Sequence, residues 1–258
     1  MSSSRFRGKV AVITGGGGGI GTAVARILLA EGGAVLLCGR TLATLEQAAR
    51  SLDSDRCAID VADVTKPEDN HRVVAAAQDR FGGLDVFVAN AGIGLPTWRI
   101  VDLPIESFDQ VMAVNVRGVF LGFKAAIPAL QARGKGSIVV VSSIAGLKAR
   151  GTGNAAYVAS KHAELGLVKT AAVECGPLGI RVNSVVPGPT DTIMIRELEA
   201  ARARDTGGSG REAILRGMPL GRYGEPEEVA RLIAFLASDD SGFCTGGVYT
   251  ADGGFSAV

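Results

Sequence analysis

Short apolar runs alternate with longer segments of helical periodicity along almost the whole chain. The apolar runs occupy residues 9–14, 34–38, 84–89, 137–142 and 180–186, with a weaker one at 56–59 and a short last one at 248–251. Helical patterns lie at 19–31, 41–52, 67–81, 105–132, 155–176 and 226–238. Strands that are apolar throughout and alternate with helices are typical of a parallel sheet covered on both faces. Because crossovers between parallel strands are right-handed, the pattern predicts an α/β fold: a doubly wound, Rossmann-like sheet of about seven strands with helices on both faces.

The length of the chain indicates a single domain. Its 258 residues are enough for one well-filled core and barely enough for two. The segment Gly207-Gly208-Ser209-Gly210 resembles a linker, but too little chain follows it for a second domain. We therefore predict one dinucleotide-binding and catalytic domain over residues 1–258, with a mobile substrate lid at about 191–217.

Composition and charge narrow the class of protein. Hydrophobic residues make up 47% and charged residues 21%, which indicates a globular chain. The formal net charge of +1 gives no field strong enough to recruit nucleic acid or an anionic membrane, so neither partner is expected. The apolar runs are far shorter than the ~20 residues that span a bilayer. The polar segment 1–9 lacks the apolar core of a signal peptide, which favours a cytoplasmic protein.

The four cysteines, Cys38, Cys57, Cys175 and Cys244, form no C-x-x-C pair. The spacing therefore suggests neither a metal site nor a redox dithiol, and buried free thiols suit a reducing compartment.

A run of five glycines follows the first predicted strand and opens the first predicted helix, reading Thr14-Gly15-Gly16-Gly17-Gly18-Gly19-Ile20-Gly21. Glycine lets the backbone approach a pyrophosphate, and the N–H groups and dipole of a helix N-terminus attract one. The strand and helix on either side are the context that a dinucleotide-binding turn requires. The residues leave two registers open: Gly16, Gly18 and Gly21 fit G-x-G-x-x-G, whereas Gly15, Gly19 and Gly21 fit T-G-x-x-x-G-x-G.

The end of the second predicted strand bears on the choice of nicotinamide cofactor. A site for NAD usually has Asp or Glu there to bind the ribose 2′-OH, whereas this chain has Gly39 followed by Arg40. A guanidinium suits bidentate binding of a phosphate. The pattern predicts NADP(H) as the preferred cofactor, with NAD(H) possible.

A second motif, Tyr157-Val158-Ala159-Ser160-Lys161, puts a phenol and an ammonium one helical turn apart on the same helix face. Free tyrosine has a pKa near 10 and is a poor base at neutral pH, but a nearby positive charge favours the phenolate. Tyr157 can therefore donate a proton to a carbonyl oxygen or accept one from an alcohol.

Further short motifs follow the two main ones in a fixed order. They are Asp63-Val64 after the third strand, Asn90-Ala91-Gly92 after the fourth, Asn115 in the long helix, Ser142-Ser143 after the fifth, Pro187-Gly188 with Thr192 after the sixth, and Asp252-Gly253-Gly254 near the end. Together with the two main motifs, they resemble the short-chain dehydrogenase/reductase family in its single-domain branch, over nearly the whole chain. Ala89, where the family often has Asn, is a mild departure.

The resemblance implies roles for these residues. It favours the register of Gly15, Gly19 and Gly21, and it assigns cofactor contacts to Gly15, Gly18, Gly19, Ile20, Gly21, Arg40, Asp63, Val64, Asn90, Ala91, Gly92, Tyr157, Lys161, Pro187, Gly188 and Thr192. Lys161 would contact the nicotinamide ribose, and Asn115 would hold a water that links Lys161 to solvent. Ser143 would bind the substrate oxygen, with Ser142 as the alternative hydroxyl. Such relatives are usually homotetramers or homodimers, here through the helices at 105–132 and 155–176.

The substrate is expected to lie against Ile93, Leu95, Trp98, Leu147, Ile193 and Met194. These mostly apolar side chains suit an apolar ketone or secondary alcohol. A 3-oxoacyl group on an acyl carrier protein or coenzyme A is the alternative substrate; the four-residue Tyr157–Lys161 spacing argues against the enoyl-reducing relatives. A catalytically retired, cofactor-binding scaffold is the alternative from another class, although Asn115, Ser143, Tyr157 and Lys161 are all present.

Overall fold

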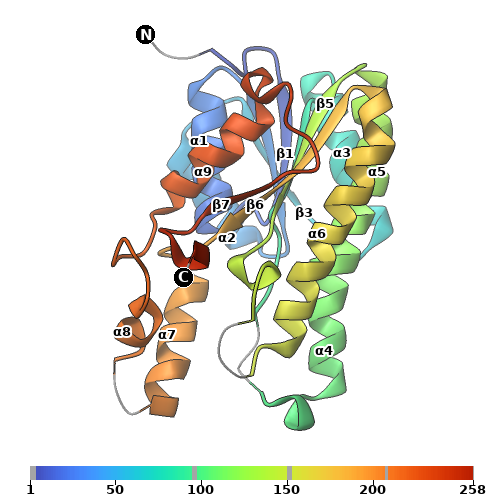
Figure 1. Cartoon of the computed structure of the whole chain (residues 1–258). Coiled ribbons are helices and arrows are strands. Elements are labelled where there is room, and N and C mark those ends of the chain that lie inside the picture. The colour runs from blue at the N-terminus through green and yellow to red at the C-terminus, as the bar shows by residue number, and fades with distance from the viewer. Residues whose placement is uncertain (1–3, 95–97, 150–152, 207–208, 258) are drawn as a thin grey trace.

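Seven parallel strands form one sheet in the order β3-β2-β1-β4-β5-β6-β7 (Figure 1). This computed structural model describes residues 4–94, 98–149, 153–206 and 209–257. The strands are β1 (Val10–Thr14), β2 (Ala34–Gly39), β3 (Cys57–Val61), β4 (Val86–Ala89), β5 (Gly136–Val141), β6 (Ile180–Pro187) and β7 (Val248–Ala251). The predicted doubly wound sheet is confirmed, and every strand lies within two residues of its expected range.

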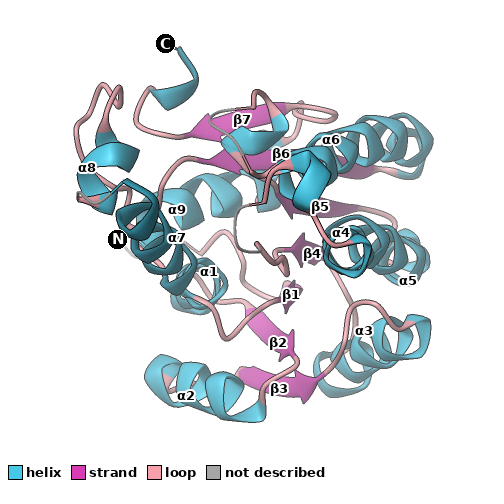
Figure 2. Ribbon diagram, turned by 90° about the horizontal axis from the view of Figure 1, so that it is seen from below, coloured by secondary structure: helices cyan, strands magenta, loops and turns pink. Residues whose placement is uncertain are grey.

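Helices cover both faces of the sheet (Figure 2). One face carries α1 (Gly19–Ala30), α2 (Leu42–Leu52) and α9 (Pro226–Ala237), and the other carries α3 (Pro67–Phe81), α5 (Gly118–Ala132) and α6 (Ala155–Cys175). Alternate residues of β1 supply the two cores: Ala11 and Ile13 pack toward α1 and α9, whereas Val10 and Val12 pack toward α3 and α5. Because both faces are buried, the strands have to be apolar throughout, which is the pattern that the sequence displays.

The predicted helix at 105–132 consists of three consecutive segments. They are α4 (Ile105–Val111), the π-helical turn η2 (Met112–Arg117) and α5. By length and mean hydropathy alone (1.3) this stretch would pass as a membrane span, yet 56% of its apolar window is buried inside the fold. The packing of α5 against the sheet and α3 accounts for its apolar composition.

The segment predicted as a lid contains two helices, α7 (Ile193–Thr206) and α8 (Gly210–Leu215). They pack on each other through a small separate core of Ile195, Ile214 and Tyr223. The Tyr223 hydroxyl donates to Glu199 Oε1 at 2.6 Å and ties the following loop to α7. The mobility of this segment stays a prediction.

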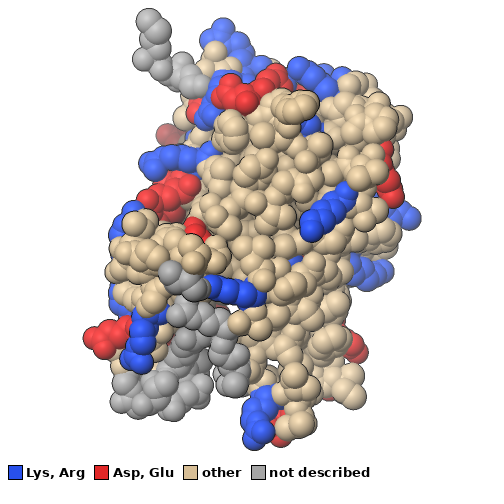
Figure 3. Space-filling model, viewed as in Figure 1, with Lys and Arg blue, Asp and Glu red and all other residues tan. Residues whose placement is uncertain are grey.

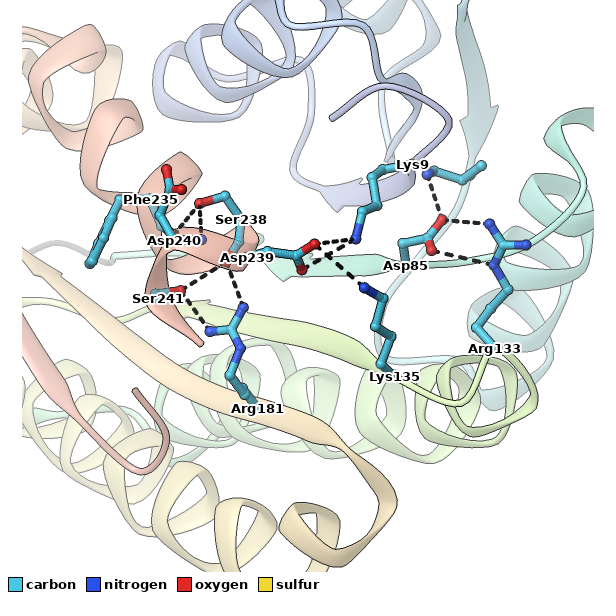
Figure 4. Close-up of polar contacts among 11 residues, drawn as sticks. Lys9, Asp85, Arg133, Lys135, Arg181, Phe235, Ser238, Asp239, Asp240 and Ser241 are labelled. Atoms are coloured by element: carbon cyan, nitrogen blue, oxygen red, sulfur yellow. Dashed lines mark hydrogen bonds and ion pairs between the residues drawn. The ribbon is translucent and has the colours of Figure 1, made fainter. Parts of the chain in front are cut away.

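Charged side chains meet at the amino ends of the strands (Figure 4). Lys9 directly precedes β1 and Lys135 directly precedes β5, and the ammonium groups of both donate to the Asp239 carboxylate, at 3.2 and 3.4 Å. Arg181, the second residue of β6, donates to the backbone oxygens of Leu236 and Ser238, which lie at the end of α9 and just beyond it. These contacts connect segments that are far apart in the sequence.

A second part of the same group centres on Asp85, which precedes β4 and is largely buried. Its Oδ2 accepts from the buried Val10 N–H at 2.9 Å and from Arg133 at 3.1 Å, and its Oδ1 accepts from Arg133 Nε at 3.3 Å. We call Lys9, Asp85, Arg133, Lys135, Arg181 and Asp239 the amino-end cluster. Each of these charged groups is bonded to an opposite charge or to the backbone.

Candidate active site

The glycine turn lies at the carboxyl end of β1, where the strand order reverses between β1 and β4. Gly15 adopts φ of +63°, a conformation that favours glycine. A Cβ on Gly21 would stand 2.6 Å from the Gly15 carbonyl oxygen, so any larger residue at position 21 would force the turn apart. Gly18 is the N-cap of α1 and has no side chain to occupy the N–H groups of the first helical turn. The turn thus offers those groups to an anion, as a pyrophosphate requires.

Thr14 and Asn90 clamp this turn to the end of β4. The Asn90 side-chain amide donates to the carbonyl oxygens of Thr14 and Gly15 at 3.0 and 3.1 Å. The Thr14 hydroxyl accepts from the backbone N–H groups of Asn90 and Ala91, both at 3.0 Å. Asn90 and Ala91 therefore hold the shape of the turn. From the sequence, Thr14 was identified only as the residue that opens the glycine run. Its role as an acceptor for the N–H groups of Asn90 and Ala91 was not predicted.

The predicted adenosine end of the site lies at the carboxyl ends of β2 and β3. Gly39 pairs with Val61, so Arg40 and Asp63 emerge at the same edge of the sheet. Arg40 is exposed between β2 and Thr41, the N-cap of α2. Asp63 Oδ1 accepts from the N–H and the hydroxyl of Thr65, which fixes the loop that also holds Val64. An exposed guanidinium group beside a helix N-terminus is a suitable arrangement for a phosphate.

Tyr157 and Lys161 lie on the first turns of α6, with the ammonium 5.6 Å from the centre of the phenol ring. Lys161 is only 4% exposed, and its Nζ donates to Val141 O at 3.3 Å and to Glu164 Oε1 at 2.7 Å. Burial alone would lower the pKa of Lys161, but the attraction of Glu164 and Tyr157 outweighs it and raises that pKa above its ordinary value. Lys161 is therefore a cation beside the phenol. Glu164 was not found from the sequence, where its only signal is its position three residues after Lys161.

The two serines after β5 differ in their surroundings. Ser142 is buried, and its hydroxyl donates to the backbone oxygen of Lys161 at 3.2 Å. Ser143 is only partly buried and accepts from Ala145 N at 3.2 Å, where it caps the short helical turn η3 (Ile144–Gly146). Because the Ser142 hydroxyl is bonded to the α6 backbone, the geometry favours Ser143 as the hydroxyl that meets a substrate.

Asn115 lies within the π-helical turn η2 and is fully buried. Its amide exchanges two hydrogen bonds with the backbone of Ile93, at 2.9 and 3.0 Å, and donates to Ser160 Oγ at 3.0 Å. A Cβ on Gly92 would be 3.5 Å from both Asn115 Oδ1 and Lys161 Nζ, so the two side chains lie close together. Asn115 thus joins the loop after β4 to α6. Its part in a water relay stays a prediction.

The predicted residues after β6 approach the glycine turn from the other side. Gly188 follows Pro187, and its N–H donates to Ala251 O at 3.0 Å. A Cβ on Gly19 would meet Thr192 Cγ2 at 3.3 Å, which puts Thr192 at the N-terminus of α1. Ile20, in the first turn of that helix, packs against the core. The structure therefore places Thr192 beside the glycine turn, as the predicted cofactor site requires.

Apolar side chains predicted to contact the substrate are partly exposed. The exposed fractions are 40% for Trp98, 39% for Leu147, 75% for Ile193 and 43% for Met194. Trp98 N donates to Gly153 O at 2.9 Å, so its loop runs beside the segment that leads to Tyr157. Ile93 is partly buried and bonded to Asn115, and Leu95 lies outside the described residues. Exposed apolar groups of this size mark a surface that contacts a ligand or a partner.

The chain is similar to known proteins over nearly its whole length. A family model described as enoyl-(acyl carrier protein) reductase matches residues 15–256. The chain is 38% identical over 260 residues to cyclohexanol dehydrogenase of Acinetobacter sp. (strain SE19), covering 100% of this chain and 98% of that one. It is 41% identical over 258 residues to cis-4-hydroxycyclohexanecarboxylate dehydrogenase of Sinomonas cyclohexanicum, covering 98% of each. A crystal structure of levodione reductase superposes with a TM-score of 0.94 at 34% identity, covering 98% of this chain and 99% of that one.

Proposed function

The chain belongs to the short-chain dehydrogenase/reductase family and is an NAD(P)-dependent oxidoreductase that acts on CH–OH groups, and we propose that it interconverts an apolar ketone and its secondary alcohol with NADP(H). The observation that carries the proposal is the Tyr157–Lys161 pair on α6: Lys161 Nζ donates to Val141 O at the carboxyl end of β5, and the glycine turn follows the carboxyl end of β1. A proton-transfer group and a dinucleotide site at one edge of the sheet are what such a reaction needs.

The residues of the turn fit a dinucleotide. Gly15 and Gly21 form a close-packed bend that a Cβ would fill, and the first turn of α1 is open to a pyrophosphate. Arg40 would hold the 2′-phosphate of NADP(H), and Thr192 would lie beside the pyrophosphate or nicotinamide. When bound, the cofactor supplies or accepts the hydride, and the protein supplies position and polarity.

The catalytic proton is assigned to Tyr157. In ketone reduction its hydroxyl donates to the substrate oxygen, and in alcohol oxidation its phenolate accepts that proton. The Lys161 cation favours the phenolate, and Ser143 donates a hydrogen bond to the substrate oxygen as charge develops there. Asn115 fixes the loop after β4 against α6, so that these groups keep their distances.

The substrate is a compact ring ketone or ring alcohol. Two relatives are named for cyclohexanol and hydroxycyclohexanecarboxylate, which share a ring that carries a hydroxyl group, and the second also carries a carboxylate. The side chains of Trp98, Leu147, Ile193 and Met194 provide an apolar wall for such a ring. The lid helices α7 and α8 would close over it. An acyl-carrier substrate is less well supported, because the basic residues just after α5, Arg133 and Lys135, which could dock a carrier, are bonded to Asp85 and Asp239.

The protein works as a homodimer or homotetramer in the cytoplasm. Ile105, Phe108 and Phe120 are exposed along α4 and α5. Val173 on α6 and Phe243 before β7 are also exposed. In the view of Figure 1, the centre of the molecular surface carries few charged side chains (Figure 3). Faces of this kind fit contacts between identical subunits.

The first test is a fluorescence titration with NADPH and NADH side by side, followed by turnover of a panel of cyclic ketones. We expect tighter binding of NADPH and a reversal of that preference in Arg40→Asp. Arg50→Asp, an exposed arginine on α2, is the matched control and keeps the wild-type preference. An unchanged preference in Arg40→Asp contradicts the NADP(H) assignment, and tight binding without turnover of any carbonyl or alcohol contradicts the enzymatic one.

A further inference from the structure

We propose that Glu164 is a positioning residue for Lys161: its carboxylate holds the ammonium in place and keeps it charged beside Tyr157. The proposal rests on the function proposed above, in which Tyr157 exchanges the catalytic proton. Glu164 has no part in the cofactor or substrate contacts assigned so far.

The geometry of the pair is that of a buried ion pair. Glu164 lies one helical turn after Lys161 on α6, and its Oε1 is 2.7 Å from Nζ. The side chains are 4% and 1% exposed, so solvent does not screen the interaction. Val141 O accepts from the same ammonium at 3.3 Å. Nζ is therefore held between strand β5 and the next turn of its own helix.

Stability does not account for a carboxylate at this position. Glu164 Oε2 is buried and accepts no hydrogen bond within the described part of the chain. A buried polar atom without a partner is uncommon and destabilising, and an apolar residue of similar size is often the more stable choice. The adjacent Leu165 and the nearby Val168 on α6 are buried and apolar. A functional reason is the better explanation for the charge.

The consequence for Tyr157 follows from the charges around Lys161. Burial raises the pKa of Glu164 against the attraction of Lys161, and the attraction of Glu164 raises the pKa of Lys161 against its own burial. The charged groups that act on Lys161 among the described residues are Glu164 and Tyr157. Strand β5 contributes the Val141 carbonyl and the Ser142 hydroxyl, and η2 contributes the amide of Asn115, none of which titrates in this range.

Without Glu164, burial would act on Lys161 with less opposition and lower its pKa. A Lys161 that loses its proton no longer favours the phenolate of Tyr157, whose ring centre is 5.6 Å from Nζ. Glu164 therefore supports proton transfer by keeping a cation beside Tyr157.

The test is the pH profile of kcat/KM for alcohol oxidation in Glu164→Gln, which keeps the shape and an oxygen acceptor but removes the charge. We expect its acid limb to move to higher pH by about one unit, because Tyr157 loses the positive charge that favours its phenolate. Glu174→Gln, an exposed glutamate on the same helix, is the control and keeps the wild-type profile. Glu164→Asp restores the charge and returns the limb toward its wild-type position, with a lower kcat because the shorter side chain displaces the ammonium.

Superimposable profiles for Glu164→Gln and Glu174→Gln overturn the proposal while leaving the role of Tyr157 intact. If Glu164→Gln does not fold, Glu164→Leu, which also removes the unpartnered oxygen, takes its place in the same comparison. An ultraviolet difference titration against Tyr157→Phe reports the ionisation of Tyr157 without any substrate. It shows the same shift if the proposal holds and none if it does not, even where turnover fails and the proposed function falls.

Discussion

The two ends of the sheet use polar side chains in opposite ways. At the amino ends, the charges of the amino-end cluster are bonded to one another or to the backbone, as with Asp85 between Arg133 and the Val10 N–H (Figure 4). At the carboxyl ends, Thr14 and Asn90 bond to the backbone of the turn and of each other, while the first turn of α1 and the Arg40 guanidinium face outward. Polar groups at the first end hold segments together, and those at the second shape a surface for a ligand.

Residues that stabilise the fold therefore lie at the amino ends of the strands, and residues that serve function lie at the carboxyl ends. A change at the amino ends is expected to alter the free energy of unfolding and to leave turnover unchanged. A change at the carboxyl ends is expected to do the reverse. Lys161 and Glu164 are the exception, because a buried ion pair at the active site bears on both.

The largest effect is expected for Tyr157→Phe. Removal of the hydroxyl takes away the proton donor and lowers kcat by about 10²–10⁴-fold, while cofactor affinity and Tm stay close to wild type. Steady-state kinetics and a cofactor titration measure the two quantities. Tyr249→Phe on β7, away from the site, is the control. Full activity in Tyr157→Phe would contradict the assignment of Tyr157 as the catalytic acid and base.

Gly21→Ala tests the glycine turn. The new Cβ would lie 2.6 Å from Gly15 O, and relief of such overpacking costs about 1–3 kcal/mol, which corresponds to a cofactor Kd raised about tenfold to a hundredfold. Gly166→Ala on α6, where a Cβ meets no atom within 4 Å, is the matched control. Equal cofactor affinities in the two variants would show that the turn does not hold the dinucleotide.

Asp85→Ala probes the other end of the sheet. It leaves the buried Val10 N–H and the Arg133 guanidinium without this acceptor, and we expect a loss of about 2–3 kcal/mol in the free energy of unfolding with kcat unchanged. Urea denaturation measures the loss, and Asp79→Ala, an exposed aspartate on α3, is the control. A drop in kcat without a drop in the free energy of unfolding would contradict the hypothesis that residues at the amino ends serve stability alone.

Asp239→Asn is expected to have the smallest effect, below ~1 kcal/mol, because the Asp239 side chain is 67% exposed and solvent screens its ion pairs. Burial opposes the shift, but the bonds from Lys9 and Lys135 hold the pKa of Asp239 below its ordinary value. The stabilisation is therefore present above the ordinary pKa of aspartate and is lost as the pH falls through the lowered one. Denaturation curves at neutral and strongly acidic pH measure the difference in the free energy of unfolding between wild type and variant. A difference that persists in acid would contradict the prediction.

The sheet could be predicted from the sequence because its strands are buried on both faces. Alternate residues of β1 enter different cores, so the run from Val10 to Ile13 had to be apolar throughout. Helix starts were also marked locally, as with Pro67 at the first position of α3. Tyr157 and Lys161 were found because their chemistry depends on spacing within one helix, which the sequence displays directly.

Features that depend on contacts between distant segments could not be predicted. The π-helical turn η2 inserts its extra residue without breaking the apolar pattern of the helix. The bonds of Asn115 to the Ile93 backbone join two segments that no periodicity connects. Helix α7 was missed because its charged sequence has no clear apolar stripe, and its small core with Tyr223 forms only in three dimensions.

The clamp on the glycine turn has a consequence for the order in which the chain folds during synthesis. The Asn90 amide that fixes Thr14 and Gly15 is encoded more than 70 residues after them. Strands β1 and β2 are available to pair early, but the turn lacks its partner until the chain beyond β4 has left the ribosome. The nucleotide site at the start of the chain is therefore completed late. A nascent chain that stalls before Asn90 would expose the turn without the bonds that give it its shape.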